Sequence, residues 1–266
     1  MTTNAAASRS SVQVTIANGI ATLTLANPSR KNAITLEMAD RIKSFCHEVD
    51  EDESIGAVIV DAQGDYFCSG ADTRDLAASS ASPASTDAVQ RTSAVYETFV
   101  SIGSLPVPSV SVVVGGAVGA GLNLALATDV MLVTPDAVLD SGFAARGIHP
   151  GGGHFSLLGR NLNRQQSMAL GVLGVPISGS EAVRLGLAWK ASLKSQIRED
   201  ATRLLEQARI DPQLTRRTKH SAHLELGPNA VSWSAAVELE RGVQMWSLAR
   251  KSESGWSTNP PRPSVN

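Results

Sequence analysis

Residues 112–129, VVVGGAVGAGLNLALATD, constrain the fold more than any other part of the chain. The β-branched and small residues of 109–114 predict a strand that is buried on both faces. A glycine cluster follows, and Leu122, Leu124 and Leu126 with interleaved alanines predict a short, wholly buried helix. The first turn of a helix has unpaired N–H groups and a partial positive charge, so this stretch predicts a place that holds negative charge.

The glycine cluster does not match the common phosphate-binding motifs. A P-loop has Lys and then Ser or Thr after its last glycine, whereas this chain has Leu122 and Asn123. The dinucleotide fingerprint G-x-G-x-x-G is also absent, since the spacing is Gly116-x-x-Gly119-x-Gly121 in mid-chain. These mismatches argue against nucleotide binding. The alternative that the glycines only permit close helix packing stays open.

Composition excludes several classes of function. The chain has 266 residues and is 42% hydrophobic, which is enough for a large core. A net charge of −2 and 4% aromatic residues offer no surface for nucleic acid. The two cysteines form no metal-binding pattern, so we expect no metal and a reducing, cytoplasmic setting. Prolines and glycines break the long uncharged stretch 98–128, so we expect no membrane span.

Sequence patterns predict the other elements in order. Two alternating strands, 12–17 and 20–25, flank Asn18-Gly19, a favoured hairpin turn. A capping box at 178–181 predicts a short helix that ends at Gly186. The remaining expected elements are a helix around 38–49, a strand over 55–60, a surface loop over 76–87, a helix over 89–102, a strand over 130–133, an irregular segment over 139–153, and helices near 197–208, 213–224 and 231–251.

The order of these elements predicts an α/β fold with a helical end. Strands and helices alternate through the first two-thirds of the chain, and helices alone fill the last third. We therefore expect a domain over 1–200 and a helical region over 201–266 that ends in a disordered, proline-containing tail.

Four ordered motifs carry a resemblance to a known family. They are NPSRKNA at 27–33, FCSGAD at 67–72, GGAVGAG at 115–121 and GIHPGGG at 147–153. Together they resemble landmarks of the crotonase, or enoyl-CoA hydratase/isomerase, superfamily, over roughly residues 12–250. The resemblance implies a spiral of ββα units, followed by a helical region that packs in trimers or dimers of trimers. It also implies binding of acyl-CoA thioesters, in which CoA is part of the substrate and no separate cofactor is needed.

The resemblance also assigns roles to particular residues. The backbone N–H groups of Ala71 and Ala120 would grip the thioester oxygen as an oxyanion hole. The resemblance places the CoA portion against four residues, Lys31, Ser69, Asp72 and Thr73.

The chain departs from the family at the acid–base pair. The positions that match the two hydratase glutamates are Asn123 and Phe143, and no glutamate occurs from Thr98 to Ser180. Neither an amide nor a phenyl ring exchanges the proton that water addition requires, which argues against ordinary hydration. Asn123 could hold a water or a carbonyl group, or it could be a satisfied buried amide.

Three residues are candidates to replace the missing acids. Asp140, His149 and His154 fall in or beside the segment that lines the family's acyl pocket, and we favour Asp140 or His149. The alternative is structural, in which Asp140 caps a turn, His149 packs behind Pro150 and His154 begins the next helix.

We expect an acyl-CoA enzyme of this superfamily that works through a thioester enolate. The alternative is a non-catalytic protein that binds or sequesters acyl-CoA. We also expect a homotrimer or homohexamer. Its apolar contacts would come from the helical last third, with Trp233, Val237, Val243 and Met245.

Overall fold

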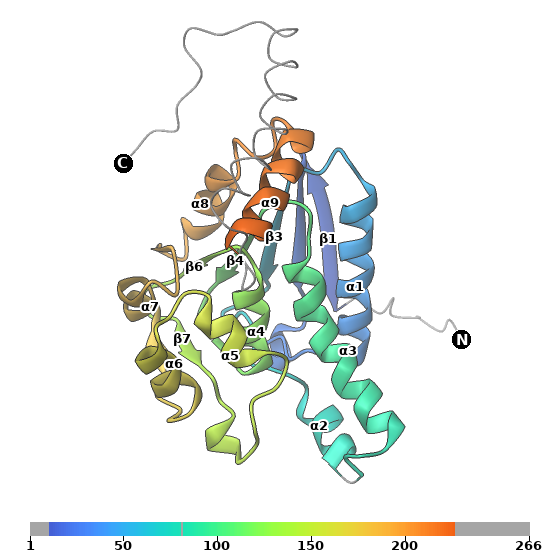
Figure 1. The fold of residues 1–266 in the computed structure, drawn as a ribbon, viewed down its shortest axis with the longest axis vertical. Coiled ribbons are helices and arrows are strands. Elements are labelled where there is room, and N and C mark those ends of the chain that lie inside the picture. Colours follow the sequence, from blue (N-terminus) through green and yellow to red (C-terminus); the bar gives the residue numbers. More distant parts are fainter. Residues whose placement is uncertain (1–10, 81, 227–266) are drawn as a thin grey trace, which may run out of the picture. The chain divides into compact units, whose positions relative to one another are not determined.

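The computed structural model describes residues 11–80 and 82–226, and the chain forms two compact units that divide after Pro212 (Figure 1). Helix α9 (Pro212–Leu226) begins at this division, and residues 213–226 are the described part of the second unit. The expected helix over 231–251, its four apolar residues and the proline-containing tail lie outside the described residues.

The first unit is built on one large sheet whose strand order is β1-β2-β3-β4-β6-β9. Its strands are β1 (Val12–Ala17), β2 (Ile20–Leu25), β3 (Ala57–Ala62), β4 (Ser109–Val113), β6 (Val130–Val133) and β9 (Lys190–Ala191). Strands β1 and β2 form the predicted antiparallel hairpin, with Asn18 and Gly19 in the left-handed conformation at φ 52° and 75°. The remaining neighbours in this sheet are parallel.

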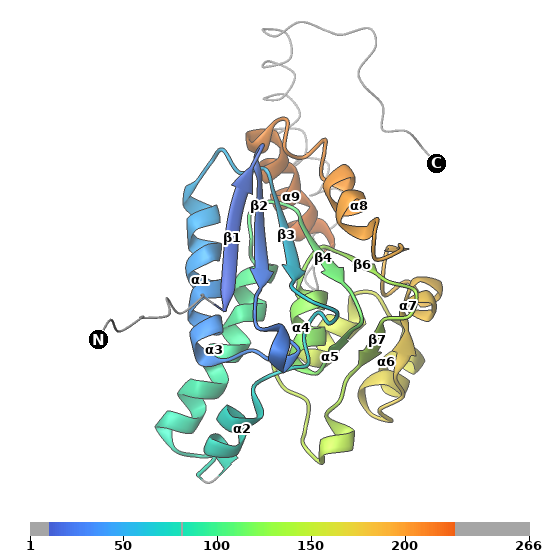
Figure 2. The same ribbon diagram turned by 180° about the vertical axis from the view of Figure 1, so that it is seen from behind.

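Helices cover both faces of the large sheet. The described helices of the first unit are α1 (Leu36–Glu51), α2 (Thr73–Ser80), α3 (Thr86–Gly103), α4 (Ala120–Ala127), α5 (His154–Gly159), α6 (Arg164–Gly171), α7 (Gly179–Leu185) and α8 (Ile197–Leu204), with short 3-10 turns η1 (Pro28–Arg30) and η2 (Ala144–Arg146). Helices α1 and α3 lie in front of the strands in Figure 1, and Figure 2 shows the strands from behind. Val58 and Val60 of β3 face the α1 side, whereas Ile59 packs in the cluster that contains Ile197 and Ala201 of α8. This two-sided burial explains the continuous apolar run of the strand.

A second, smaller sheet contains β5 (Gly116–Val118), β7 (Val138–Asp140) and β8 (Ile177–Ser178). Single parallel bridges, Ile34 to Ala71 and Cys68 to Ala117, extend the same layer toward the N-terminus. The large-sheet strands β2, β3, β4 and β6 are therefore each followed by a short stretch in the small layer and then by a helix. The α/β class and the predicted spiral of ββα units are confirmed.

Two local predictions were wrong in part. The expected loop over 76–87 contains the end of α2 and the start of α3, because Asp72 and Ser85 cap these helices through bonds to Arg74 N and Ala88 N. The glycine cluster also contains strand β5 rather than only a turn. Gly116 makes this possible, since a Cβ there would lie 2.8 Å from the carbonyl oxygen of Val138.

The predicted helix after the capping box is confirmed as α7. Ser178 Oγ accepts the backbone N–H of Glu181 at 3.1 Å, and Gly186 ends the helix at φ 84°. The Glu181 carboxylate binds Arg184.

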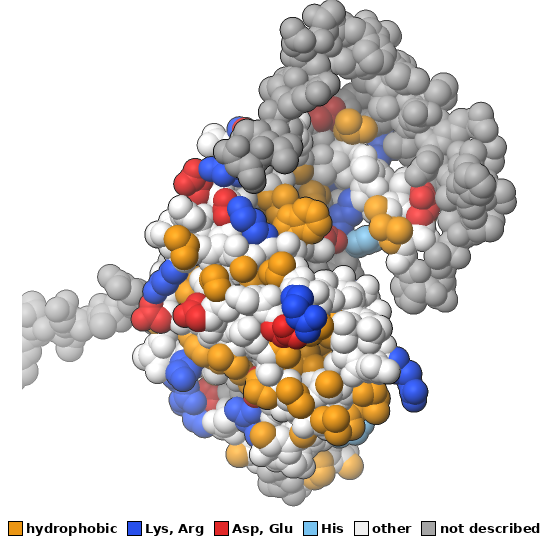
Figure 3. Space-filling model, turned by 90° about the vertical axis from the view of Figure 1, so that its left-hand side faces the viewer, with side chains coloured by type: hydrophobic (Ala, Val, Ile, Leu, Met, Phe, Trp, Pro, Cys, Tyr) orange, Lys and Arg blue, Asp and Glu red, His pale blue; other side chains and the backbone are white. Residues whose placement is uncertain are grey.

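Exposed apolar side chains gather after α6 and around β9. The most exposed of them are Leu173, Trp189 and Leu193, which are 60% to 73% exposed. Figure 3 shows the side of the molecule on which α6, α7 and α8 lie, with hydrophobic side chains spread over it. None of the helices in the described ranges is both long and apolar enough to cross a membrane.

The first turn of α4 sits directly on the backbone of Cys68. A Cβ at Gly121 would lie 2.3 Å from the Cys68 carbonyl oxygen. We expect Gly121→Ala to lower the free energy of unfolding by about 1–3 kcal/mol through overpacking, as measured by urea denaturation. Gly159→Ala is the matched control, because a Cβ there meets nothing within 4 Å in α5. An equally small effect at both positions would contradict this packing.

Candidate active site

The first unit contains a cavity of about 420 Å³ at the ends of successive ββα turns. Its lining brings together many of the residues that the sequence singled out, namely Lys31, Ser69, Ala71, Thr73, Ala120, Asn123, Phe143 and His149. Asp72 and Asp140 are not part of this lining.

Ala71 and Ala120 present two free backbone N–H groups to the cavity. Ala120 is the first residue of α4, where helical N–H groups have no partner in the helix. Ala71 follows Gly70, and neither alanine N–H donates a hydrogen bond to any group in the described part of the chain. A Cβ at Gly70 would lie 3.7 Å from Ala120 N, so the two loops are in contact. The pair can donate two hydrogen bonds to one oxygen atom.

Glycine conformations make this arrangement possible. Gly119 has φ 56° and ψ −118°, and Gly70 has φ 109°, which residues with a side chain rarely adopt. The strand ladder holds both loops in register, because Val118 N donates to the Cys68 carbonyl at 3.0 Å. The glycine pattern therefore serves the approach of the two loops.

Asn123 belongs to a buried hydrogen-bonded chain. Its Nδ2 donates to the Gly151 carbonyl at 2.9 Å, and its Oδ1 lies 2.7 Å from His154 Nδ1. His154 Nε2 lies 2.7 Å from Ser141 Oγ. Burial lowers the pKa of His154 to about 4, so the imidazole is neutral near pH 7.

Phe143 precedes η2 and packs against the same histidine. Its ring meets His154 edge-on, with centroids 5.1 Å apart. The two positions that the resemblance matches to the hydratase glutamates carry an amide and a phenyl ring. Among the described residues that line the cavity, the only carboxylate belongs to Asp75.

The two favoured substitute residues lie in different surroundings. Asp140 Oδ1 accepts the backbone N–H of Gly142 at 2.7 Å, which is the geometry of a turn cap. His149 lines the cavity and is exposed, and its Nδ1 lies 2.6 Å from the Pro150 carbonyl. Within the described ranges, no group of three His, Cys, Asp or Glu residues is placed to hold a metal ion.

Four basic residues line the cavity, Arg30, Lys31, Arg91 and Arg146. Lys31 Nζ lies 5.1 Å from the centroid of the Tyr66 ring, a cation–π contact. Arg146 Nη1 donates to the Gly142 carbonyl at 3.0 Å. Since Arg30 pairs with Asp72 and Arg91 with Asp87, the excess of positive charge over the one acidic residue of the lining comes from Lys31 and Arg146, and it suits an anionic ligand.

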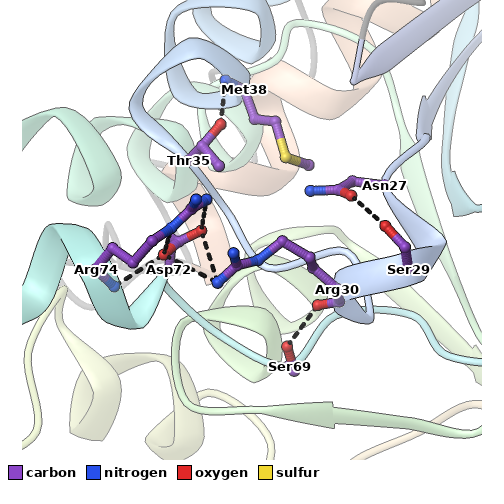
Figure 4. A network of polar contacts seen from close by, with 8 residues as sticks. All are labelled: Asn27, Ser29, Arg30, Thr35, Met38, Ser69, Asp72 and Arg74. Carbon is purple, nitrogen blue, oxygen red and sulfur yellow. Dashed lines mark hydrogen bonds and ion pairs between the residues drawn. The ribbon is translucent and has the colours of Figure 1, made fainter.

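Asp72 has a structural position beside the cavity (Figure 4). Its carboxylate is 1% exposed and pairs with Arg74 at 2.9 Å and Arg30 at 3.3 Å, and its Oδ1 caps α2 at Arg74 N. The hydrogen bond from the Arg74 side chain is the largest cause of the lowered pKa of Asp72. Ser69 Oγ donates to the Arg30 carbonyl at 3.3 Å. Arg30 is therefore held at two points, through its guanidinium by Asp72 and through its carbonyl by Ser69.

Sequence reasoning missed two residues that organise the site. Asn32 is fully buried with φ 54°, and its Nδ2 donates to the carbonyls of Gln63 and Tyr66. This ties the loop of Lys31 to the loop that precedes Ala71. The second residue is Ser141, whose Oγ lies 2.7 Å from His154 Nε2. The motif NPSRKNA at 27–33 contains Asn32 and was a signal for it, whereas no nearby sequence pattern marks Ser141 as the partner of His154.

Comparison of the sequence with known families identifies the family of this chain. Residues 15–242 match the enoyl-CoA hydratase/isomerase family, and the chain belongs to it. The resemblance to the crotonase superfamily is confirmed.

Relatives and a solved structure agree with this assignment. The chain is 37% identical over 177 residues to the probable enoyl-CoA hydratase EchA14 of Mycobacterium tuberculosis (strain ATCC 25618 / H37Rv), covering 66% of this chain and 68% of the relative. It is 29% identical over 198 residues to the 1,2-epoxyphenylacetyl-CoA isomerase of Escherichia coli (strain K12), covering 74% and 75%. A Thermobifida fusca YX protein described as an enoyl-CoA hydratase, crystallised in complex with acetoacetyl-CoA, matches with TM-score 0.79 at 23% identity, over 91% of this chain and 96% of that one. That likeness shows the shared fold.

Asp72 gives the fold a defined pH dependence. Its folded-state pKa is lowered, so its contribution to stability is present above the unfolded pKa of about 3.9 and is lost as pH falls through the folded value. We expect Asp72→Asn, which keeps the cap, to lower the free energy of unfolding by about 1–2 kcal/mol at pH 7, because the partner arginines remain hydrated. The difference from wild type should shrink below about pH 4.

Urea denaturation at pH 7 and at pH 3 measures this difference. Asp87→Asn is the matched control, since Asp87 is 74% exposed and pairs with Arg91 four residues later. Its effect should stay within about 0.5 kcal/mol. A loss at Asp72 that is equal at both pH values would show that the carboxylate charge is not responsible.

Proposed function

We propose that this protein binds acyl-CoA thioesters and holds the thioester oxygen between the N–H groups of Ala71 and Ala120. The observation that carries the proposal is that both donors lack an acceptor in the described chain and line one cavity. The family assignment supports it, as does the acetoacetyl-CoA in the related Thermobifida fusca structure. Two such donors stabilise the negative charge of an enolate oxygen.

The CoA portion has a matching place beside these donors. Lys31, Ser69 and Thr73 line the same cavity, and Arg30 lines it as a second cation. These groups can pair with CoA phosphates, which are anionic acceptors suited to Lys and Arg. Asp72 then acts by fixing Arg30 and the start of α2, without itself meeting the ligand.

The reaction that we propose runs through a thioester enolate and is not hydration. Hydration needs a group that activates water and a group that delivers a proton, and Asn123 and Phe143 do neither. The relative from Escherichia coli is named as an isomerase of a CoA thioester and not as a hydratase, which supports this proposal. His149 lies in the segment that the resemblance matches to the family's acyl pocket, and it lines the cavity. We propose this histidine as the proton carrier.

A second candidate function is binding without turnover. The neutral Asn123 amide, held by the Gly151 carbonyl and His154, favours it, since no group of this hydrogen-bonded chain carries a proton into the cavity. Turnover of any member of a panel of acyl-CoA thioesters would favour the enzyme over binding without turnover.

The protein is also proposed to self-associate and to act in the cytoplasm. The exposed apolar side chains around Leu173, Trp189 and Leu193 offer a surface for contact between copies, consistent with the trimer or hexamer expected from the sequence.

The oxyanion hole is tested at Ala120, the first residue of α4. Proline is tolerated at the first helical position, so Ala120→Pro removes the N–H with little change to the helix. We expect hexanoyl-CoA to bind wild type more tightly than S-hexyl-CoA, a thioether that lacks the carbonyl oxygen. Ala120→Pro leaves only the Ala71 donor, so it should reduce that preference by about 1–2 kcal/mol in calorimetry, whereas Ala120→Ser should keep it.

A thioester preference that is undiminished in a folded Ala120→Pro protein would contradict the assignment of this donor. Equal binding of the two ligands by wild type would contradict the oxyanion hole itself.

A further inference from the structure

We propose that the Asn123 carboxamide donates a hydrogen bond to an oxygen on C3 of the acyl chain, so that the preferred ligands are 3-oxoacyl-CoA thioesters. His154 and Ser141 are the positioning residues that hold the amide in this orientation. The inference rests on the proposed function, because it takes the thioester oxygen to lie at Ala120 N.

The Gly151 carbonyl determines which atoms donate and which accept in the hydrogen bonds that join Asn123, His154 and Ser141. The Gly151 carbonyl only accepts, so the end of Asn123 that faces it is Nδ2. The other end is then Oδ1, and His154 Nδ1 must carry a hydrogen to donate to it. Because the imidazole is neutral, Nε2 accepts, and Ser141 Oγ donates.

This chain holds the amide rigidly. Asn123, Ser141 and His154 are each at most 2% exposed, and the rings of Phe143 and Phe155 pack edge-on against the imidazole. A flipped amide would place Oδ1 against the Gly151 oxygen and Nδ2 against a protonated Nδ1. Both contacts are repulsive, so one orientation prevails.

The fixed amide has one hydrogen left over. Nδ2 carries two hydrogens and donates one to Gly151, and no group in the described part of the chain accepts the second. Asn123 lines the cavity, so this hydrogen is available to a bound molecule. A donor that stays unpaired in a closed site is energetically costly, which makes the position selective for an acceptor.

Helix geometry places this donor relative to the thioester. Ala120 and Asn123 are three residues apart on α4 and share a face, with a rise of about 4.5 Å between them. A carbonyl oxygen at Ala120 and an acceptor at Asn123 would then be separated by about one helical turn. Two carbonyl groups in a 1,3 relation on an acyl chain span this separation when their oxygens point apart. A 3-oxo group is an acceptor only and matches a site that offers only a donor.

The matched ligands 3-oxohexanoyl-CoA and hexanoyl-CoA test the proposal by calorimetry. They share CoA and the thioester and differ at C3. We expect wild type to bind the 3-oxo ligand about tenfold more tightly. Asn123→Leu, which is similar in shape, should lose this preference while it still binds hexanoyl-CoA. Equal affinities of wild type for the two ligands would overturn the inference and leave the proposed function standing, whereas binding of neither ligand would overturn both.

The positioning role is tested at His154 with a matched pair of variants. His154→Asn puts an amide nitrogen near the place of Nδ1 and should retain the preference, whereas His154→Leu should lose it. In wild type, ¹⁵N spectra of the side chain should show a neutral imidazole protonated at Nδ1, and Ser141→Ala should weaken that tautomer. An imidazole protonated at Nε2 in wild type would overturn the assignment of roles, and this measurement needs no variant to fold.

Discussion

The contact between the first turn of α4 and the backbone of Cys68 sets the geometry of the site. Only glycine at position 121 lets the helix come this close, since any Cβ would lie within 2.3 Å of a carbonyl oxygen. The parallel bridge from Cys68 to Ala117 fixes the register of the same two segments. As a result, the N–H groups that follow each segment, at Ala71 and Ala120, face one cavity.

These two donors occupy equivalent places in consecutive turns of the spiral. In each turn a strand of the large sheet leads to a short stretch in the small layer, and the next residues begin a helix or its cap. Phe143 follows β7 in the next turn and lines the same cavity. In our proposal, the fold supplies the oxyanion hole from backbone alone, and the Asn123 side chain selects the acyl groups that fit it.

The sequence predicted most of this arrangement where the pattern was local. Hairpin residues Asn18 and Gly19 and the buried strand over 109–114 follow from turn chemistry and periodicity. Helix α2 was not predicted, because a Ser- and Ala-rich composition hides a cap made by Asp72. The hydrogen bonds that join Ser141, His154 and Asn123 could not be predicted either, because these residues come from separate turns of the spiral and meet only after folding.

Hydration of crotonyl-CoA by the wild-type protein tests the central claim, that this family member keeps the oxyanion hole without the carboxylates for water addition. Loss of the enoyl absorbance measures the rate directly. The account predicts a turnover at least about 10²-fold below the typical enzymatic value of about 10 s⁻¹, since positioned acid–base groups supply that factor or more. Turnover at about 10 s⁻¹ would contradict it and would place catalytic carboxylates elsewhere in the chain.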